Sequence, residues 1–364
     1  MSELTKGDVE QVIAGFTDPY LQKNLVELNW VSDISIDQGV VTVTLVYPYP
    51  NKGLHGALRQ MLSLSVEDLD GVTECTVEIH NRIVARKTAN NIAALPQVKN
   101  VIAVASGKGG VGKSTVAVNL ALALAEEGAK TGILDADIYG PSIGMMLGIK
   151  EGTRPGVLDE KYFIPVPAHG LQTMTMAYLV TEETPMIWRG PMASGALQQL
   201  LTQTHWQELD YLIVDMPPGT GDIQLTLAQK APVTGAVIVT TPQDIALLDC
   251  KKGIEMFRKV NIPVLGIVEN MSLYCCPDCG HQEPVFGEGG GQRIAEQYQT
   301  GLVGQLPLNR TIREQTDSGS PTVINAPDSE IALKYRDMAR KVAAELVIKA
   351  GEDELAAPDI IARS

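Results

Sequence analysis

Residues 101–126 carry the pattern that most restricts what this chain can fold into. The apolar run VIAVA is followed by SGKGGVGKST and then by a segment with the apolar spacing of a helix. Residues 107–114 fit the pattern G-x-x-x-x-G-K-[ST]. In such a loop, glycines let backbone N–H groups turn inward around phosphate oxygens, and the helix that follows adds about half a positive charge at its start. The pattern therefore predicts a phosphate-binding loop, or P-loop, in an α/β fold.

Two lysines lie in this loop, although one is enough to hold a phosphate. We expect Lys113 to meet the β- and γ-phosphates of a nucleotide and the Ser114 hydroxyl to meet Mg²⁺. A glycine-rich structural turn is the alternative interpretation of the same residues. The pattern assigns no role to Lys108, so the function of this second lysine does not follow from the pattern alone.

Three aspartates follow apolar runs further along the chain. Asp135 and Asp137 come after TGIL, and because they are two residues apart they share a face while the chain is extended. Asp215 follows YLIV, which is the layout of the acid that holds Mg²⁺ in P-loop enzymes. One aspartate at a strand end is often a cap or a turn residue. Three in this order behind a P-loop predict a magnesium-nucleotide site.

From residue 100 onward, apolar strands alternate with longer helices, which is the βαβ signature of a parallel sheet. The runs are apolar on both faces, as expected for a sheet that helices cover on each side. We therefore expect an α/β P-loop NTPase fold with a doubly wound, mostly parallel sheet, and a last long helix over residues 329–349. The expected strands are residues 101–105, 131–134, 211–214, 236–240 and 264–268.

Residues 1–88 predict a separate, small α+β domain. Helical apolar spacing precedes an alternating segment that turns at residues 37–39, as in a β-hairpin. The polar segment 89–99 contains Pro96 and predicts a linker. The expected division is a small domain (1–88), a linker (89–99), a P-loop domain (100–349) and an acidic, flexible tail (350–364).

The formal net charge is −14, which opposes binding to the backbone of DNA or RNA, so nucleic acid is not an expected partner. The first residues contain no apolar core of secretory length. No later run approaches the roughly 18 to 20 apolar residues of a membrane span. We expect no membrane association and a cytoplasmic location.

Three of the five cysteines, Cys275, Cys276 and Cys279, fall within five positions. This spacing is typical of a metal or redox site and not of a disulfide framework. Cys276 and Cys279 supply two thiolates, whereas a structural zinc ion or a 4Fe-4S cluster usually takes four. A two-fold homodimer would bring two copies together and complete the set.

The stretches SGKGGVGKST, DADIYGPS and DMPPGTGD resemble the deviant Walker A, switch I and switch II motifs of the MinD/ParA/Mrp class of P-loop ATPases. The resemblance implies an ATP-hydrolysing homodimer in which Lys108 reaches the nucleotide of the other subunit. It implies that Asp137 positions the attacking water and that Asp135 and Asp215 support Mg²⁺. The residues implied to hold ATP in the loop are Gly107, Lys108, Gly109, Gly110, Val111, Gly112, Lys113, Ser114 and Thr115.

The same resemblance implies that Asn270, in VENMS, reads the edge of adenine. Asn270 follows the apolar run of PVLGIVENM and is expected at the carboxyl end of the sheet, where open α/β sheets bind ligands. Its amide can donate and accept at once, as adenine requires. A turn residue is the alternative interpretation.

The CPDC motif, together with DMPPGTGD and VENMS, is similar to the Mrp/ApbC branch of this class, whose members are iron-sulfur cluster carriers. The resemblance covers residues 100–340 and implies that Cys276 and Cys279 of two subunits hold a bridging 4Fe-4S cluster. It implies a low ATPase activity coupled to cluster transfer, with assembly factors as donors and apo iron-sulfur proteins as acceptors. Residues 1–88 are similar to a small iron-sulfur-assembly domain, but VYPYPNKG stands where its relatives commonly have a cysteine.

Other interpretations stay open at this point. Thiolate pairs also bind zinc, so a zinc-bridged structural dimer is an alternative, and a redox-active disulfide is another. A ParA- or MinD-like partitioning or positioning ATPase would need a basic surface or a basic amphipathic helix, and the chain ends in GEDELAAPDIIARS. Cys275 and His281 are alternative ligands or structural residues. Cys75 and Cys250 are expected to be buried packing residues.

Overall fold

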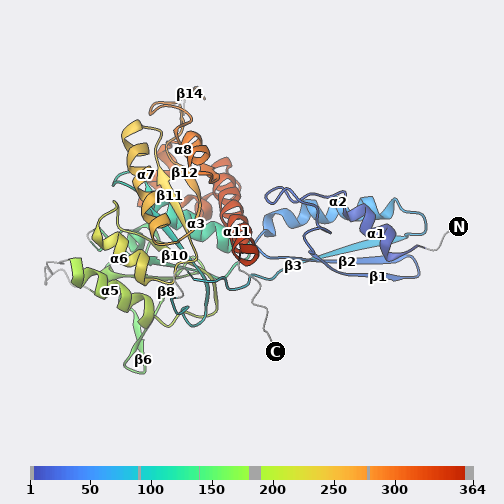
Figure 1. Cartoon of the computed structure of the whole chain (residues 1–364), viewed down its shortest axis with the longest axis horizontal. Helices are drawn as coiled ribbons and strands as arrows, with labels where there is room; N and C mark the ends of the chain where they lie inside the picture. The colour runs from blue at the N-terminus through green and yellow to red at the C-terminus, as the bar shows by residue number, and fades with distance from the viewer. Residues whose placement is uncertain (1–3, 89–91, 139, 180–189, 277–278, 357–364) are drawn as a thin grey trace. The chain divides into compact units, whose positions relative to one another are not determined.

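The structure is a computed structural model that describes residues 4–88, 92–138, 140–179, 190–276 and 279–356. The chain divides into two compact units, which are described here one at a time (Figure 1). Unit 1 consists of residues 1–84 and 126–128, and unit 2 consists of residues 85–125 and 129–364.

Unit 1, drawn in blue in Figure 1, places two helices against a three-stranded sheet of order β1-β2-β3. β1 and β2 are antiparallel, and β3 runs parallel to β2 after a helical crossover. Its elements are α1 (Lys6–Ile13), β1 (Val31–Asp37), β2 (Val40–Tyr47), the 3₁₀ helix η1 (Lys52–Leu54), α2 (His55–Glu67) and β3 (Glu74–Asn81).

The sequence accounts for the main turns of unit 1. Thr5 caps α1, because its hydroxyl accepts from the Asp8 N–H while the Asp8 carboxylate accepts from the Thr5 N–H. The hairpin turns where predicted, and Gln38 and Gly39 both have positive φ, as a two-residue type I′ turn requires. Strand β2 buries alternate residues, including Val41 and Val43, and these form the core.

Unit 2 contains an eight-stranded sheet of order β15-β12-β11-β4-β10-β5-β9-β8. All neighbours are parallel except β8, which runs antiparallel to β9 at one edge. The strands are β4 (Val98–Ala105), β5 (Thr131–Asp135), β8 (Val166–Ala168), β9 (Leu171–Thr175), β10 (Leu209–Asp215), β11 (Gly235–Thr240), β12 (Val264–Glu269) and β15 (Leu302–Gln305). The doubly wound, mostly parallel sheet expected from the sequence is confirmed, with β8, β9 and β15 added at its edges.

The helices of unit 2 form layers on both faces of this sheet. Because parallel crossovers are right-handed, α3, between β4 and β5, lies on one face. The connections that run in the opposite direction place α5, α6, α7 and α8 on the other face, where each packs on the next. The helices are α3 (Lys113–Glu126), α4 (Ile143–Met146), α5 (Gly190–Gln203), α6 (Asp222–Lys230), α7 (Asp244–Lys259), α8 (Gly290–Tyr298), α9 (Arg310–Asp317), α10 (Thr322–Asn325) and α11 (Glu330–Ala356).

Two short hairpins and one 3₁₀ helix complete unit 2. The 3₁₀ helix η3 (Met176–Tyr178) follows β9. One hairpin pairs β6 (Gly156–Leu158) with β7 (Tyr162–Ile164), and the other pairs β13 (Tyr274–Cys275) with β14 (Gln282–Glu283). The second hairpin carries the cysteines singled out in the sequence.

The C-terminal helix differs from its prediction. The sequence predicted a helix that ends at residue 349 and a flexible tail over residues 350–364. Helix α11 instead continues to Ala356, so residues 350–356 are helical, and residues 357–364 lie outside the described residues. The run EDELA consists mostly of residues that favour helix, and an acidic composition does not by itself end one.

Candidate functional site

The P-loop joins the end of β4 to the start of α3, as the sequence predicted. Gly110 and Gly112 both have a φ of 83°, a backbone conformation that side chains disfavour. A Cβ on Gly112 would overlap Nδ2 of Asn270, and one on Gly107 would overlap the carbonyl oxygen of Asp249. Gly110 and Gly112 therefore bend the loop. Gly112 also lets Asn270 approach the loop, and Gly107 lets α7 approach it.

Lys113 forms a buried ion pair with Asp215. The distance from Lys113 Nζ to Asp215 Oδ1 is 2.5 Å, and the two side chains are 6% and 0% exposed. Lys113 Nζ also lies 3.2 Å from the Ser114 hydroxyl oxygen. Burial raises the pKa of Asp215, and the charge of Lys113 opposes that rise. The structure thus brings together three residues that the sequence assigned to phosphate and magnesium.

The second carboxylate oxygen of Asp215, Oδ2, is buried and has no hydrogen-bond partner within the part of the chain that the structure describes. A buried carboxylate oxygen is costly to leave unpaired, so such an atom calls for an explanation. Magnesium prefers oxygen ligands such as carboxylates and hydroxyls. The Ser114 hydroxyl is close by, because Lys113, the partner of Asp215, also contacts it. The donor set here fits a magnesium ion.

Asp135 lies beside Asp215, because β5 and β10 pair in a register that sets the two aspartates opposite each other. Its carboxylate accepts from the backbone N–H groups of Asp137 at 3.0 Å, Ser142 at 2.9 Å and Ile143 at 3.1 Å. Burial raises the pKa of Asp135 to about 7, and the negative charge of Asp215 adds to the rise. Asp135 therefore shapes the turn after β5 and also lies opposite Asp215, the partner of Lys113.

Asp137 lies beyond the end of β5, so it does not continue the extended strand on which the two aspartates would share a face. It is half-buried, and one of its oxygens accepts from the Gly140 N–H at 3.3 Å. The chain is therefore not extended from Asp135 to Asp137, and the shared face expected for an extended chain does not form. The reason is that the Asp135 carboxylate accepts from the backbone N–H of Asp137, which turns the chain there.

Lys108 is half-buried, and its backbone carbonyl accepts from the Ser106 hydroxyl at 2.9 Å. Among the described residues its ammonium group takes part in no salt bridge. Within the described part of the chain, the loop thus uses the backbone carbonyl of Lys108 but forms no salt bridge with its side chain.

Asn270 follows β12 directly and is 8% exposed. Its side-chain nitrogen donates to the backbone oxygen of Val111 at 2.8 Å, so at the carboxyl end of β12 it lies against the P-loop. The other amide hydrogen and the amide oxygen are the groups that an adenine would use. The role in reading adenine stays a prediction.

Glu269 is a buried carboxylate next to Asn270 that the sequence analysis missed. It is buried at the end of β12, where its carboxylate accepts from the Gly291 N–H at the start of α8 and from the Gln305 amide. A carboxylate at a helix start is favourable, so Glu269 ties β12, α8 and β15 together. The signal in the sequence was a glutamate that directly continues an apolar strand.

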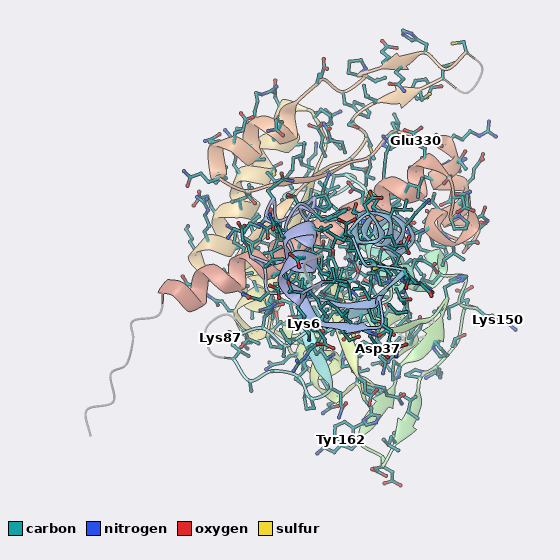
Figure 2. All side chains as sticks on the ribbon, turned by 90° about the vertical axis from the view of Figure 1, so that its right-hand side faces the viewer. Lys6, Asp37, Lys87, Lys150, Tyr162 and Glu330 are labelled. Atoms are coloured by element: carbon teal, nitrogen blue, oxygen red, sulfur yellow. The ribbon has the colours of Figure 1, made fainter. Side chains whose placement is uncertain are left out.

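The cysteine motif lies on the β13–β14 hairpin, which extends from unit 2 at the top of Figures 1 and 2. The Cys276 N–H donates to the His281 carbonyl at 2.9 Å, and the Gly280 N–H donates to the Cys276 carbonyl at 2.9 Å. Cys276 is half-buried and Cys279 is exposed, while Pro277 and Asp278 lie outside the described residues. Cys275 is half-buried, and its thiol donates to the Gly280 carbonyl at 3.7 Å.

The described residues contain no disulfide and no group of three or more His, Cys, Asp or Glu side chains arranged to hold a metal ion. Cys75 and Cys250 are buried. Burial raises the pKa of Cys75 to about 11 and that of Cys250 to about 12, so neither thiol ionises readily. This burial agrees with the packing role expected for both.

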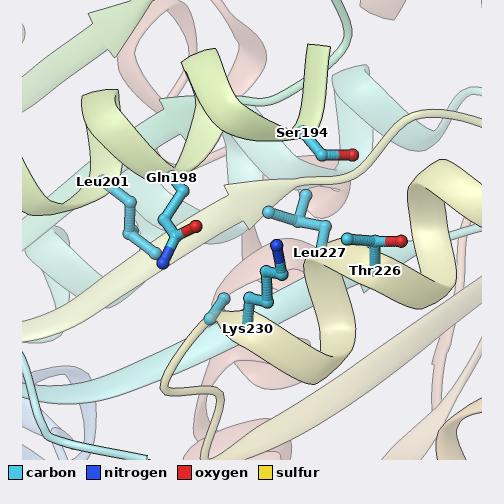
Figure 3. Close-up of a pocket in the computed structure, with 7 residues that line it drawn as sticks. Ser194, Gln198, Leu201, Thr226, Leu227 and Lys230 are labelled. Atoms are coloured by element: carbon cyan, nitrogen blue, oxygen red, sulfur yellow. The ribbon is translucent and has the colours of Figure 1, made fainter. Parts of the chain in front are cut away.

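A small pocket between α5 and α6 has a volume of about 10 Å³, which is room for about one water molecule (Figure 3). Its lining includes Ser194, Gln198, Leu201, Thr226, Leu227 and Lys230. It is too small for a nucleotide or a substrate.

None of the helices among the described residues has the length and apolar character of a membrane span.

Residues 97–343 match the family model described as NUBPL iron-transfer P-loop NTPase, and residues 6–79 match the one described as iron-sulfur cluster assembly protein. The chain is 63% identical over 279 residues to an iron-sulfur cluster carrier protein of Pseudomonas fragi, covering 77% of this chain and 97% of that protein. It is 52% identical over 344 residues to the iron-sulfur cluster carrier protein of Escherichia coli K12, covering 94% and 93%.

Among solved structures, unit 2 is similar to a nucleotide-binding protein of Archaeoglobus fulgidus in complex with ADP. The TM-score is 0.56 and the sequence identity is 38%, over 64% of this chain and 90% of that protein.

Proposed function

Because the chain belongs to the family of NUBPL iron-transfer P-loop NTPases, we propose that it is an ATP-dependent iron-sulfur cluster carrier. It binds and hydrolyses ATP at the P-loop, holds a labile cluster through Cys276 and Cys279, and delivers that cluster to apo iron-sulfur proteins. One observation carries the proposal. The same unit has a buried lysine-aspartate pair at the P-loop and, on a projecting hairpin, the half-buried Cys276 and the exposed Cys279.

The hairpin supplies two thiolates from each chain, whereas a 4Fe-4S cluster usually takes four cysteines. A second copy related by a two-fold axis would supply the other two. The cluster is therefore expected to bridge a homodimer. The exposure of Cys279 supports this arrangement, because a shared ligand has to be reachable by a partner.

At the P-loop, a nucleotide phosphate would compete with Asp215 for the Lys113 ammonium. Mg²⁺ would be held by the Ser114 hydroxyl and by Asp215, whose Oδ2 is buried without a partner among the described residues. Asp135 lies opposite Asp215 on the neighbouring strand and would support the same ion. When bound, the metal ion neutralises charge on the phosphates.

The remaining roles follow from position. Asp137 is half-buried beyond β5 and would orient the attacking water, and Asn270 would read adenine beside Val111. Lys108 would act on the nucleotide of the second subunit, which its lack of a salt bridge among the described residues allows. Donors of the cluster would be iron-sulfur assembly factors.

Anaerobic reconstitution with iron and sulfide tests the proposal directly. We expect a visible chromophore, about four iron and four sulfide per dimer, and transfer to an apo-acceptor that changes with ATP. Cys276→Ala should remove the chromophore, whereas Cys75→Ala in unit 1 should retain it. A Cys276→Ala protein that still holds and delivers the cluster contradicts the proposal.

The same experiment separates the zinc alternative, because stoichiometric zinc with no chromophore after anaerobic purification identifies a zinc-bridged dimer. The partitioning or positioning alternative is not favoured. The family model that covers most of unit 2 is described as iron-transfer, and similar proteins over most of the chain are named cluster carriers.

A further inference from the structure

Residues 270–276, here called the connector, follow β12, begin beside the P-loop and lead into the cysteine hairpin. At one end, Asn270 Nδ2 donates to the Val111 carbonyl at 2.8 Å. Beside it, Met271 Cε lies 3.8 Å from the position that a Cβ of Gly112 would take. At the other end, the Cys276 N–H is held by the His281 carbonyl. A few residues thus separate a P-loop contact from a proposed cluster ligand.

The connector is fixed along its length by the segment that follows β15. The Leu306 N–H donates to the Glu269 carbonyl at 3.0 Å, and the Ser272 N–H donates to the Leu306 carbonyl at 2.9 Å. The Ser272 hydroxyl reaches the same carbonyl at 3.0 Å, and the Leu308 N–H donates to the Leu273 carbonyl at 2.8 Å. This ladder leaves the connector little freedom to absorb a displacement locally.

Met271 has a φ of 57°, in the left-handed region that a long side chain disfavours. Such a residue keeps this conformation only where its surroundings determine it. Its surroundings here are Gly112 on one side and the backbone ladder at Ser272 on the other. The bend at Met271 is therefore set jointly by the P-loop and by the segment after β15.

The P-loop has two arrangements available, because Lys113 can pair with Asp215 or with a phosphate. A phosphate that takes Lys113 from Asp215 would also be bound by backbone N–H groups of the loop, so it would act directly on the backbone around Val111 and Gly112. Asn270 and Met271 touch this stretch of backbone. A coupling between sites needs such a two-state element that both sites bias.

We propose that the connector transmits the state of the P-loop to the cysteine hairpin and that Met271 is the positioning residue that sets the hairpin's response. The meaning of this coupling for cluster delivery rests on the proposed function. The coupling itself is a property of the chain without a cluster, so it is testable separately.

Hydrogen exchange of the full-length, cluster-free protein tests the proposal, with and without Mg²⁺ and a non-hydrolysable ATP analogue. The informative amides are those of Ser272, Cys276 and Leu308, whose acceptors are given above. We expect the analogue to change their exchange rates by about fivefold or more. An unchanged rate at all three amides, with the analogue demonstrably bound, overturns the proposal.

Met271→Gly relieves the left-handed conformation and removes the methyl group beside Gly112. We expect the response of Cys276 to the analogue to fall below about twofold, while the affinity for the analogue changes by less than about threefold. The matched control is Asn261→Gly, because Asn261 also has a left-handed φ, of 54°, but precedes β12. The control should respond like the wild type.

A wild-type response in Met271→Gly overturns the proposal. If that variant does not fold, Ser272→Ala takes its place, since it removes only the hydroxyl bond to Leu306. Its response should be reduced, and an undiminished one also overturns the proposal. Cluster content and transfer are measured separately. A protein that binds cluster but has no exchange response refutes the coupling alone, and one that binds no cluster refutes the proposed function.

Discussion

The P-loop and the cysteine hairpin are joined by the connector, yet they are built in different ways. Around the P-loop, Lys113 and Asp215 are buried, and strands from the middle of the sheet supply the neighbouring groups. The hairpin consists of two-residue strands, and its cysteines are half-buried or exposed. One region is enclosed by its own chain, and the other faces outward.

This difference indicates how many chains each site needs. The P-loop has its lysine, its hydroxyl and its carboxylates in place within unit 2, so we expect a single chain to bind a nucleotide. The hairpin offers two thiolates, so a cluster requires ligands from elsewhere. Substitutions that separate nucleotide binding from hydrolysis and from cluster binding are therefore the sharpest tests.

The largest effect is expected at Lys108. Lys108→Ala should depress ATP hydrolysis by about 10³-fold, as when a positive group supplied by a partner is lost. Nucleotide affinity should change little, because the Lys108 ammonium has no salt bridge among the described residues to lose. Single-turnover hydrolysis and titration with a fluorescent nucleotide measure the two quantities.

Lys113→Ala is the matched comparison in the same loop, and it should impair binding itself, since Lys113 is the buried cation beside Asp215. If both substitutions abolish binding equally, the role of Lys108 in the second subunit is wrong. Neither substitution should lower the iron content after reconstitution.

The next largest effect separates the hairpin thiols from the buried ones. At pH 8 the thiolate fractions of Cys75 and Cys250 should be of order 10⁻³ and 10⁻⁴, because burial raises their pKa values to about 11 and about 12. The thiolate is the form that reacts with alkylating agents. Below the pKa of a thiol, its thiolate fraction grows about tenfold per pH unit, and its labelling rate should grow with it. Alkylation followed by peptide mass spectrometry should find Cys276 and Cys279 labelled at least about 100-fold faster. Comparable rates would mean that the buried cysteines are open to solvent.

A smaller effect is expected from packing at the P-loop. Gly107→Ala should lower the free energy of unfolding by about 1–3 kcal/mol, because the new Cβ would overlap the Asp249 carbonyl. Gly109→Ala is the control in the same loop, since nothing lies within 4 Å of its Cβ position. Denaturant unfolding without nucleotide measures both. Equal stabilities would mean that α7 does not pack on the loop as described.

The smallest effect is expected at Cys275. Cys275→Ala removes a weak bond of 3.7 Å to the Gly280 carbonyl, so the free energy of unfolding should change by less than about 0.5 kcal/mol. Iron and sulfide content after reconstitution should equal that of the wild type. A protein that loses its cluster would make Cys275 a ligand and not a structural residue.

Much of the fold could be predicted because its signals are local. The central strands are unbroken apolar runs, and the glycine pattern of the P-loop follows one of them directly. Asp135, Asp215 and Asn270 could be placed at one edge of the sheet because parallel strands share a carboxyl end. The short strands β8, β9 and β15, toward the two ends of the sheet, have no comparable apolar run, so they were missed.

The contacts of the site were harder to foresee, because their partners lie far apart in the sequence. Lys113 and Asp215 are 102 positions apart, and Asn270 and Val111 are 159 apart. Glu269 looked like part of an apolar strand, and its role depends on where α8 begins. The left-handed bend at Met271 could not be predicted, because the residue in that conformation is not a glycine.

The sheet order also bears on how the protein is made. Strand β4 lies between β10 and β11, both of which are synthesised much later. At about 5–20 residues per second, the ribosome needs about 5–20 s to add the 102 positions between Lys113 and its partner Asp215. Throughout that interval the nascent P-loop lacks both neighbouring strands. Among the strands of this sheet, β4 is followed by the longest stretch of chain before a neighbouring strand is synthesised. A chaperone that shields residues 101–126 during synthesis would therefore protect the segment that stays unpaired for the longest time.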